Sequence, residues 1–155
     1  MALTETERAG IEKEIAESFD RRAACIGALR AVQASRAWVS DEAMREVAEM
    51  LNMTPAELES VATFYSLIFR EPVGRTVLKV CDSVVCWALG AESRLAHLER
   101  KLGIKAGETT PDGEFTLLRI CCLGDCDHAP CLMVNDRQVG NVTEEVLDRI
   151  VAGEG

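Results

Sequence analysis

The chain reads Cys81-Asp-Ser-Val-Val-Cys86 and, after 35 further residues, Cys122-Leu-Gly-Asp-Cys126. Two short cysteine pairs separated by a spacer are typical of a four-thiolate metal site, because each pair lies in one loop and the fold brings the loops together. Gly124 has no Cβ atom, so it allows the backbone of the second loop to turn until both sulfurs face one point. The stretch therefore predicts a metal centre held by two cysteine pairs.

Several kinds of site compete for these thiols. Disulfides are disfavoured, because the amino terminus Met1-Ala-Leu-Thr-Glu-Thr-Glu7 is acidic and lacks the basic and apolar regions of a secretory signal, which indicates a reducing compartment. A redox-active dithiol requires the spacing Cys-x-x-Cys, which no pair in this chain has. Structural zinc stays open, since both spacings lie within its usual range. On spacing alone, an iron–sulfur cluster is the favoured interpretation and zinc is the alternative.

The first half of the chain is predicted to be helical. Apolar residues recur at helical spacing in three segments, residues 1–18, 21–34 and 41–51. Thr54-Pro55-Ala56-Glu57 combines a capping box with proline at the first helical position, so a further helix is expected to begin there. Apolar residues, including Phe64 and Ile68, cover much of the surface of this helix. This predicts packing on more than one side, in part against the second half of the chain and in part against another subunit.

The second half alternates strands and helices. Strand-type runs are predicted at 76–80, which ends beside Cys81, and at 115–120, which leads into the second cysteine pair. The residues after Cys86 become helical, a hairpin is expected around Asn135-Asp136, and a last helix follows. The resulting order β-α-β-β-β-α fits a small α+β layer structure in which helices cover a sheet.

A boundary is predicted between the two halves. Glu71-Pro-Val-Gly74 places a proline and a glycine where the helical pattern ends. We therefore expect an N-terminal helical region at residues 1–74 and a second domain at residues 75–155. A chain of 155 residues has room for this arrangement but none for a separate catalytic domain.

Composition argues against several functions. A net charge of −9 disfavours nucleic-acid binding, which depends on basic patches that neutralise phosphates. The longest apolar stretch, Val84–Ala91, is far shorter than the roughly 20 residues that a membrane helix requires. No glycine-rich phosphate loop follows a predicted strand, so the chain is not expected to bind NADH by itself.

Four blocks of sequence carry a resemblance to a known family. They are Val61-Ala-Thr-Phe-Tyr-Ser-Leu-Ile-Phe69, Pro72-Val-Gly74, Cys81-Asp-Ser-Val-Val-Cys86 and Cys122-Leu-Gly-Asp-Cys126-Asp-His-Ala-Pro130. Together they resemble the E subunits of NADH-quinone oxidoreductase, the family of the small 2Fe-2S subunit in the peripheral arm of complex I. The resemblance implies an α+β fold in which an N-terminal helical bundle precedes a thioredoxin-like 2Fe-2S ferredoxin domain.

The same resemblance implies one 2Fe-2S cluster per chain. The expected ligands, for both the metal and the cofactor, are Cys81, Cys86, Cys122 and Cys126. Cys122 is preferred over the adjacent Cys121 because it matches the Cys-x3-Cys loop of the family, although a Cys121–Cys126 pair is geometrically possible.

An electron-carrier role follows from the resemblance, with no catalytic residues in this chain. The carrier is expected to accept single electrons from the FMN of a partner flavoprotein subunit that oxidises NADH, among other peripheral-arm subunits. The expected location is cytoplasmic, peripheral to the inner membrane as part of a complex. Two alternatives stay open: the equivalent subunit of an NAD-linked formate dehydrogenase or hydrogenase, and a zinc-stapled structural or assembly module.

Other residues are predicted to be structural. Cys25 is expected in the helical core, and Cys131 is expected to be buried where it opens an apolar strand. His97 lies among charged residues and is expected at the surface. His128 is expected to neighbour the site rather than to ligate, since four cysteines leave no vacancy. Trp87 is expected to shield the site, with contact to a partner as the alternative.

Overall fold

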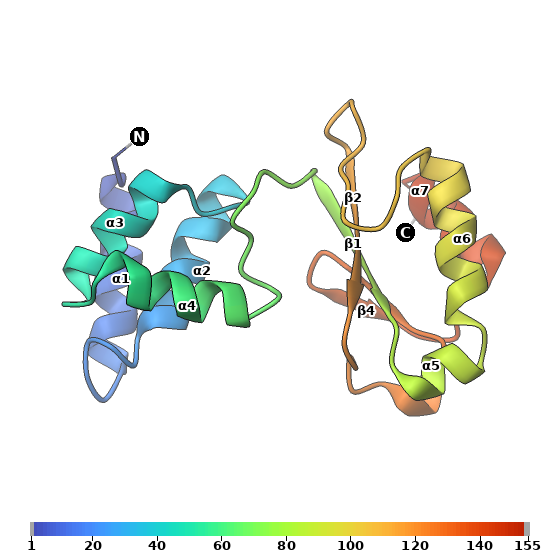
Figure 1. The fold of residues 1–155 in the computed structure, drawn as a ribbon, viewed down its shortest axis with the longest axis horizontal. Coiled ribbons are helices and arrows are strands. Elements are labelled where there is room, and N and C mark those ends of the chain that lie inside the picture. Colours follow the sequence, from blue (N-terminus) through green and yellow to red (C-terminus); the bar gives the residue numbers. More distant parts are fainter. Residues whose placement is uncertain (1, 154–155) are drawn as a thin grey trace. The chain divides into compact units, whose positions relative to one another are not determined.

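The computed structural model describes residues 2–153. Its contacts divide the chain into two compact units, Met1–Pro72 and Val73–Gly155. Among the described residues, the first unit contains helices only, whereas the second combines helices with a sheet (Figure 1). The fold class expected from the sequence, an α+β chain that begins with a helical bundle, is confirmed. Within residues 2–153, the helices are too short or too polar to cross a membrane.

Four helices make up the described part of the first unit: α1 (Glu5–Glu17), α2 (Cys25–Arg36), α3 (Asp41–Met50) and α4 (Pro55–Phe64). Thr4, Ser40 and Thr54 cap three of them, because each side chain accepts a hydrogen bond from the backbone N–H three residues further on. The capping box at α4 is complete, since the Glu57 carboxylate accepts from the Thr54 N–H at 2.8 Å. The predicted start of this helix is confirmed.

The first unit has its own apolar core, in which α2 contacts each of the other helices. Its fully buried side chains include Ile11, Leu29, Val47, Leu51 and Leu58. Ile68 was expected on a partner surface, but it is only 6% exposed and packs into this core, so that expectation is wrong. The reason is that the chain turns back after α4. The Gln33 side chain holds the returning segment through the Leu67 carbonyl and the Phe69 N–H.

The second unit is built on four strands: β1 (Thr76–Cys81), β2 (Phe115–Ile120), β3 (Leu132–Val134) and β4 (Arg137–Val139). Their order across the sheet is β2-β1-β3-β4. β1 is parallel to β2 and antiparallel to β3, and β3 and β4 form the predicted hairpin. Asn135 has a φ of 53° in the hairpin turn, a left-handed conformation that asparagine tolerates well.

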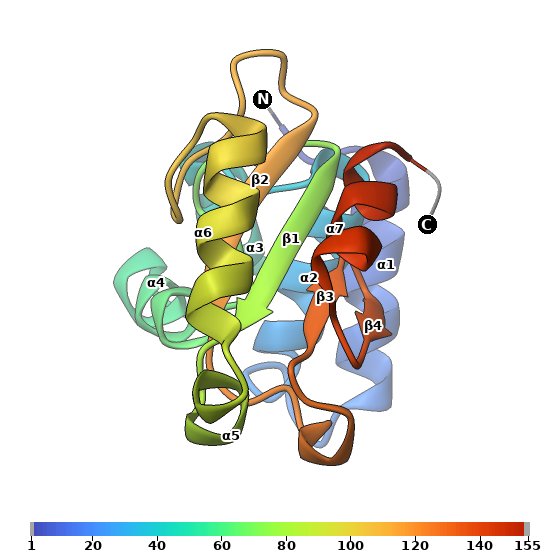
Figure 2. The same cartoon turned by 90° about the vertical axis from the view of Figure 1, so that its right-hand side faces the viewer.

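Two helices, α6 (Ala91–Leu102) and α7 (Glu144–Val151), cover one face of this sheet (Figure 2). Leu95 and Leu98 from α6 and Leu147 from α7 pack on Leu78 and Leu117 of the sheet. The short helix α5 (Val84–Ala88) was not predicted. Cys86 therefore lies on a helical turn rather than in the loop expected for it.

Candidate metal centre

The cysteine segments meet because β1 and β2 run parallel. Cys81 is the last residue of β1 and pairs in register with Ile120, the last residue of β2. Parallel strands end at the same edge of a sheet, so the segments that follow them leave side by side. The Asp82 N–H still donates to the Ile120 carbonyl at 3.0 Å. The sheet thus brings the first and second cysteine segments together.

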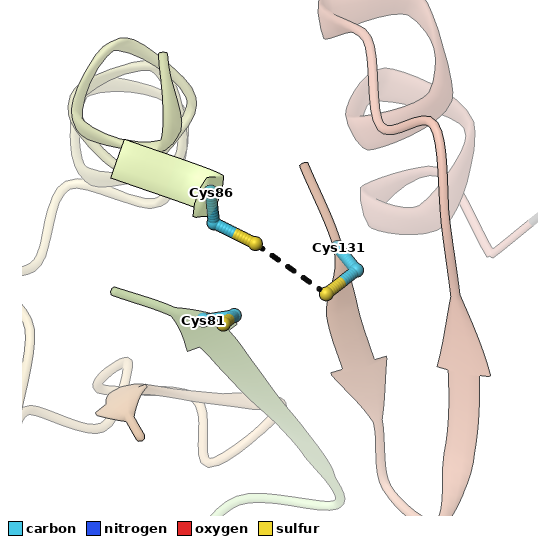
Figure 3. Close-up of side chains that lie close together, drawn as sticks. All are labelled: Cys81, Cys86 and Cys131. Atoms are coloured by element: carbon cyan, nitrogen blue, oxygen red, sulfur yellow. Dashed lines mark hydrogen bonds between the residues drawn. The ribbon is translucent and has the colours of Figure 1, made fainter. Parts of the chain in front are cut away.

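Three buried thiols converge at this edge (Figure 3). Cys81 comes from β1, Cys86 from α5, and Cys131 from the residue before β3, and their sulfurs lie within 4.8 Å of one another. The sulfurs of Cys86 and Cys131 are 3.6 Å apart. The predicted burial of Cys131 is confirmed, with 3% of the residue exposed. Its contact with the other two thiols was not foreseen.

Strand pairing explains the position of Cys131. In the antiparallel ladder, Val80 of β1 lies opposite Leu132 of β3. The next position along is therefore Cys81 opposite Cys131, and the Cys81 N–H donates to the Cys131 carbonyl at 3.3 Å. No sequence pattern indicates this neighbour, because the two residues are 50 positions apart and only the pairing of β1 with β3 joins them.

Cys122 and Cys126 form a second pair that is exposed to solvent. Their sulfurs are 3.6 Å apart. Gly124, between them, has a φ of 80°, which favours glycine, and its N–H donates to Cys122 Sγ at 3.4 Å. The neighbouring Leu123 N–H donates to the Cys81 sulfur. This bond links the exposed pair to the buried thiols.

Hydrogen bonds from residues other than the cysteines stabilise the loop that carries Cys122 and Cys126. His128 Nδ1 lies 2.6 Å from Asp125 Oδ1, and this hydrogen bond, together with the nearby carboxylate of Asp127, raises the pKa of His128. The Gln138 side chain donates to the Leu123 carbonyl at 3.2 Å. His128 is therefore a neighbour of the centre, as expected, and it helps to shape the loop that carries Cys126.

Burial and hydrogen bonding act in opposite directions on the buried thiols. Burial raises the pKa of Cys81, but hydrogen bonds from the Ser83 and Leu123 N–H groups and from the Cys86 and Cys131 side chains together leave the pKa below its usual value. Burial also raises the pKa of Cys86, and the Cys131 N–H offsets this only in part. Burial raises the pKa of Cys131 well above its usual range. Backbone donors thus favour thiolate at Cys81, whereas the surroundings of Cys131 favour the protonated thiol.

The remaining candidates do not belong to either group of sulfurs. Cys25 is half-buried at the first residue of α2. Cys121 is exposed, and the sulfur that approaches Cys126 belongs to Cys122. His97 was expected at the surface but is half-buried, with Nε2 2.8 Å from a carboxylate oxygen of Asp148 on α7. Trp87 is 61% exposed, which favours the partner-contact alternative over shielding.

Comparison with known proteins identifies the family to which this chain belongs. The sequence profile described as thioredoxin-like 2Fe-2S ferredoxin matches residues 11–153, and the chain therefore belongs to that family. Over 149 residues it is 48% identical to the E subunit of NADH-quinone oxidoreductase from Pseudomonas aeruginosa and 47% identical to that from Escherichia coli K12. Each match covers 96% of this chain and 90% of the relative. Within its family, the chain groups with the E subunits of NADH-quinone oxidoreductase.

Solved structures show the same fold inside a longer protein. Two structures of an NAD+-reducing NiFe hydrogenase, in the H2-reduced and air-oxidised states, match with TM-scores of 0.71 and 0.68 at 25% identity. The matches cover 81% and 82% of this chain but only 22% and 23% of the hydrogenase chain. This chain thus spans about a fifth of the length of that protein.

The thiols fit the 2Fe-2S cluster that defines the family. Such a cluster takes four cysteine thiolates. Two sulfurs that share one tetrahedral metal ion at about 2.3 Å lie about 3.8 Å apart, close to the 3.6 Å between Cys122 and Cys126. The Cys81 and Cys86 sulfurs lie within 4.8 Å of each other, an upper bound that is compatible with a shared metal ion. Backbone N–H groups directed at the sulfurs of Cys81 and Cys122 are also typical of iron–sulfur sites.

Proposed function

We propose that this chain is an electron-carrier subunit whose single cluster is held by Cys81, Cys86, Cys122 and Cys126. The proposal rests on two pairs of sulfurs that follow the same edge of the sheet. The Cys81 and Cys86 pair is buried, and the Cys122 and Cys126 pair is exposed. Cys81 at the rigid end of β1 and Cys86 on α5 would hold the centre in place, while the exposed pair would leave it accessible to a partner. When bound, a 2Fe-2S cluster takes up and releases one electron at a time.

The surface beside the centre suits a protein donor. Helix α5 carries Cys86 on its buried side and exposes Val84, Val85 and Trp87, and Leu89 is exposed directly after it. Apolar residues grouped on one exposed turn are typical of an interaction surface. We infer that this turn contacts a flavoprotein subunit whose FMN takes a hydride from NADH and passes on single electrons. The chain would then be a subunit of an NADH-quinone oxidoreductase, as the named relatives are. We propose for this chain a location on the cytoplasmic side of the inner membrane.

The ligand assignment is tested by single Cys→Ser variants at positions 81, 86, 122 and 126. Each is expected to lose most of its iron and acid-labile sulfide, together with the EPR signal of the dithionite-reduced cluster, because serine is a poor iron ligand. Cys25→Ser is the matched control, since Cys25 lies on α2, and it should keep both.

Two results would contradict the assignment. If Cys122→Ser keeps a normal spectrum while Cys121→Ser abolishes it, the second loop binds through the other cysteine. If the purified chain carries zinc without labile sulfide, the centre is a structural zinc site.

A further inference from the structure

The centre contains one more thiol than a 2Fe-2S cluster uses. Four cysteines are assigned to the cluster above, yet Cys131 is buried like Cys81 and Cys86, and its sulfur lies close to theirs. Its side chain packs in the same small cluster, which also includes Ala91, Leu123 and Ala129. A fifth thiol in this position is close enough to act on the ligands without being one.

Cys131 is hydrogen-bonded to both buried ligands, Cys81 and Cys86. Its carbonyl accepts from the Cys81 N–H at 3.3 Å, and its own N–H donates to the Cys86 sulfur. Its Sγ lies 3.6 Å from Cys86 Sγ, within the range of a sulfur hydrogen bond (Figure 3). Strand pairing on one side and these bonds on the other leave the side chain little freedom to turn away.

The direction of this sulfur–sulfur bond follows from the chemistry of ligation. Cysteine binds iron as a thiolate, so a ligating Cys86 has no proton to donate. Cys131 is not a ligand in the proposed set, and a third negative sulfur beside two thiolates would be repelled by them. The proton between the two sulfurs therefore belongs to Cys131.

We propose that the Cys131 thiol donates a hydrogen bond to Cys86 Sγ and thereby raises the reduction potential of the cluster. The proposal rests on Cys86 being a ligand, as proposed above. Reduction adds negative charge to the cluster and its sulfurs, and a hydrogen bond to a ligand sulfur stabilises the more negative state. Cys131 is a positioning residue here, since it acts through Cys86.

The test compares variants that keep or remove the donor in the full-length, cluster-loaded chain. Cys131→Ser keeps a hydroxyl donor, Cys131→Ala removes it, and Cys131→Val removes it while filling the space. Redox titration followed by EPR should place the Ala and Val variants at a more negative potential than wild type. The reduction potential of the Ser variant should be close to that of wild type. Cys25→Ala, which removes a thiol on α2, should leave the potential unchanged.

The outcomes separate this proposal from the ligand assignment. Equal potentials for wild type, Ser, Ala and Val, with the cluster retained, would overturn the role of Cys131 and leave the ligand set intact. If the potential of the Ser variant is as negative as those of the Ala and Val variants, the hydroxyl donor has no effect. That result would also overturn the role of Cys131. Loss of the cluster in all three variants, with Cys126→Ala retaining it, would make Cys131 a ligand and overturn both proposals.

Discussion

Gly140 packs so closely against the second cysteine loop that no side chain fits there. A Cβ atom at this position would lie 2.4 Å from His128 Cβ and 3.0 Å from a carboxylate oxygen of Asp125. Both neighbours belong to the segment that carries Cys126, and the adjacent Asn141 N–H donates to the His128 carbonyl at 2.5 Å. Gly140 thus fixes how near β4 comes to the exposed thiols.

Gly140→Ala is expected to push this loop outward. The clash should lower the free energy of unfolding by about 1–3 kcal/mol, as overpacking generally does, and should leave the purified chain with less iron and sulfide than wild type. Gly113→Ala is the control for strain away from the site: its φ of 70° makes alanine unfavourable there, but its added Cβ has no neighbour within 4 Å and it precedes the opposite end of β2. The measurement is the iron and sulfide content of both variants after the same purification. Equal iron in the two variants would contradict the role given to Gly140.

At the scale of elements, a buried ion pair joins α1 to α2. Glu7 is 2% exposed, and its carboxylate accepts hydrogen bonds from Arg36 Nε at 2.6 Å and from Ser35 Oγ at 2.7 Å. The Arg36 bond is the main reason that the pKa of Glu7 is lowered from 4.5 to about 2, against the opposing effect of burial. The pair therefore links the stability of the helical bundle to pH.

Glu7→Gln should destabilise the first unit most at neutral pH. Because the folded pKa is depressed, the stabilisation is fully present above pH 4.5 and is lost as the pH falls toward 2. The shift corresponds to about 3 kcal/mol. Urea unfolding at several pH values should show a wild-type advantage of this order at pH 7 that shrinks between pH 4.5 and 2. The control Glu12→Gln, on the exposed side of α1, should show no comparable loss of stability. If the wild-type advantage over Glu7→Gln is the same at every pH, the linkage between this ion pair and pH is refuted.

The carboxyl end of α4 presents a second apolar surface. Phe64 is 81% exposed and packs edge-to-face on Tyr65, with ring centroids 5.3 Å apart. An aromatic pair left in solvent is typical of a contact surface, and one that lies on the helical bundle suits a neighbouring subunit.

Phe64→Asp is expected to leave the fold and the cluster intact and to weaken co-purification with the flavoprotein subunit. Ile68→Asp differs, because it buries a charge in the core and should destabilise the bundle itself by several kcal/mol. Circular dichroism, iron content and pull-down yield distinguish the two variants. Normal co-purification of folded Phe64→Asp would exclude this surface.

The whole molecule contains one proposed redox centre and, in its sequence, no dinucleotide fingerprint. The isolated chain should therefore take up one electron from dithionite and show no NADH oxidation with artificial acceptors. Addition of the flavoprotein subunit should make the cluster reducible by NADH. Turnover of NADH by this polypeptide alone, free of flavin, would overturn the carrier assignment.

Local sequence determined the positions of most elements. The capping box at Thr54 located α4, the strand-type run before Cys81 located β1, and Asn135-Asp136 located the hairpin. These signals involve residues within a few positions of one another, so they need no knowledge of the fold. The spacing of the cysteine pairs pointed to a metal centre for the same reason.

Tertiary structure decided which side chains meet. Ile68 became a core residue because the chain turned back on α2, and His97 became half-buried because α7 packed beside α6. Cys131 joined Cys86 because β3 pairs with β1 in a register that places it next to Cys81. Strand order and register depend on contacts between distant residues, and no local preference specifies them. The sequence therefore predicted two cysteine pairs, and only the folded sheet revealed the fifth thiol among them.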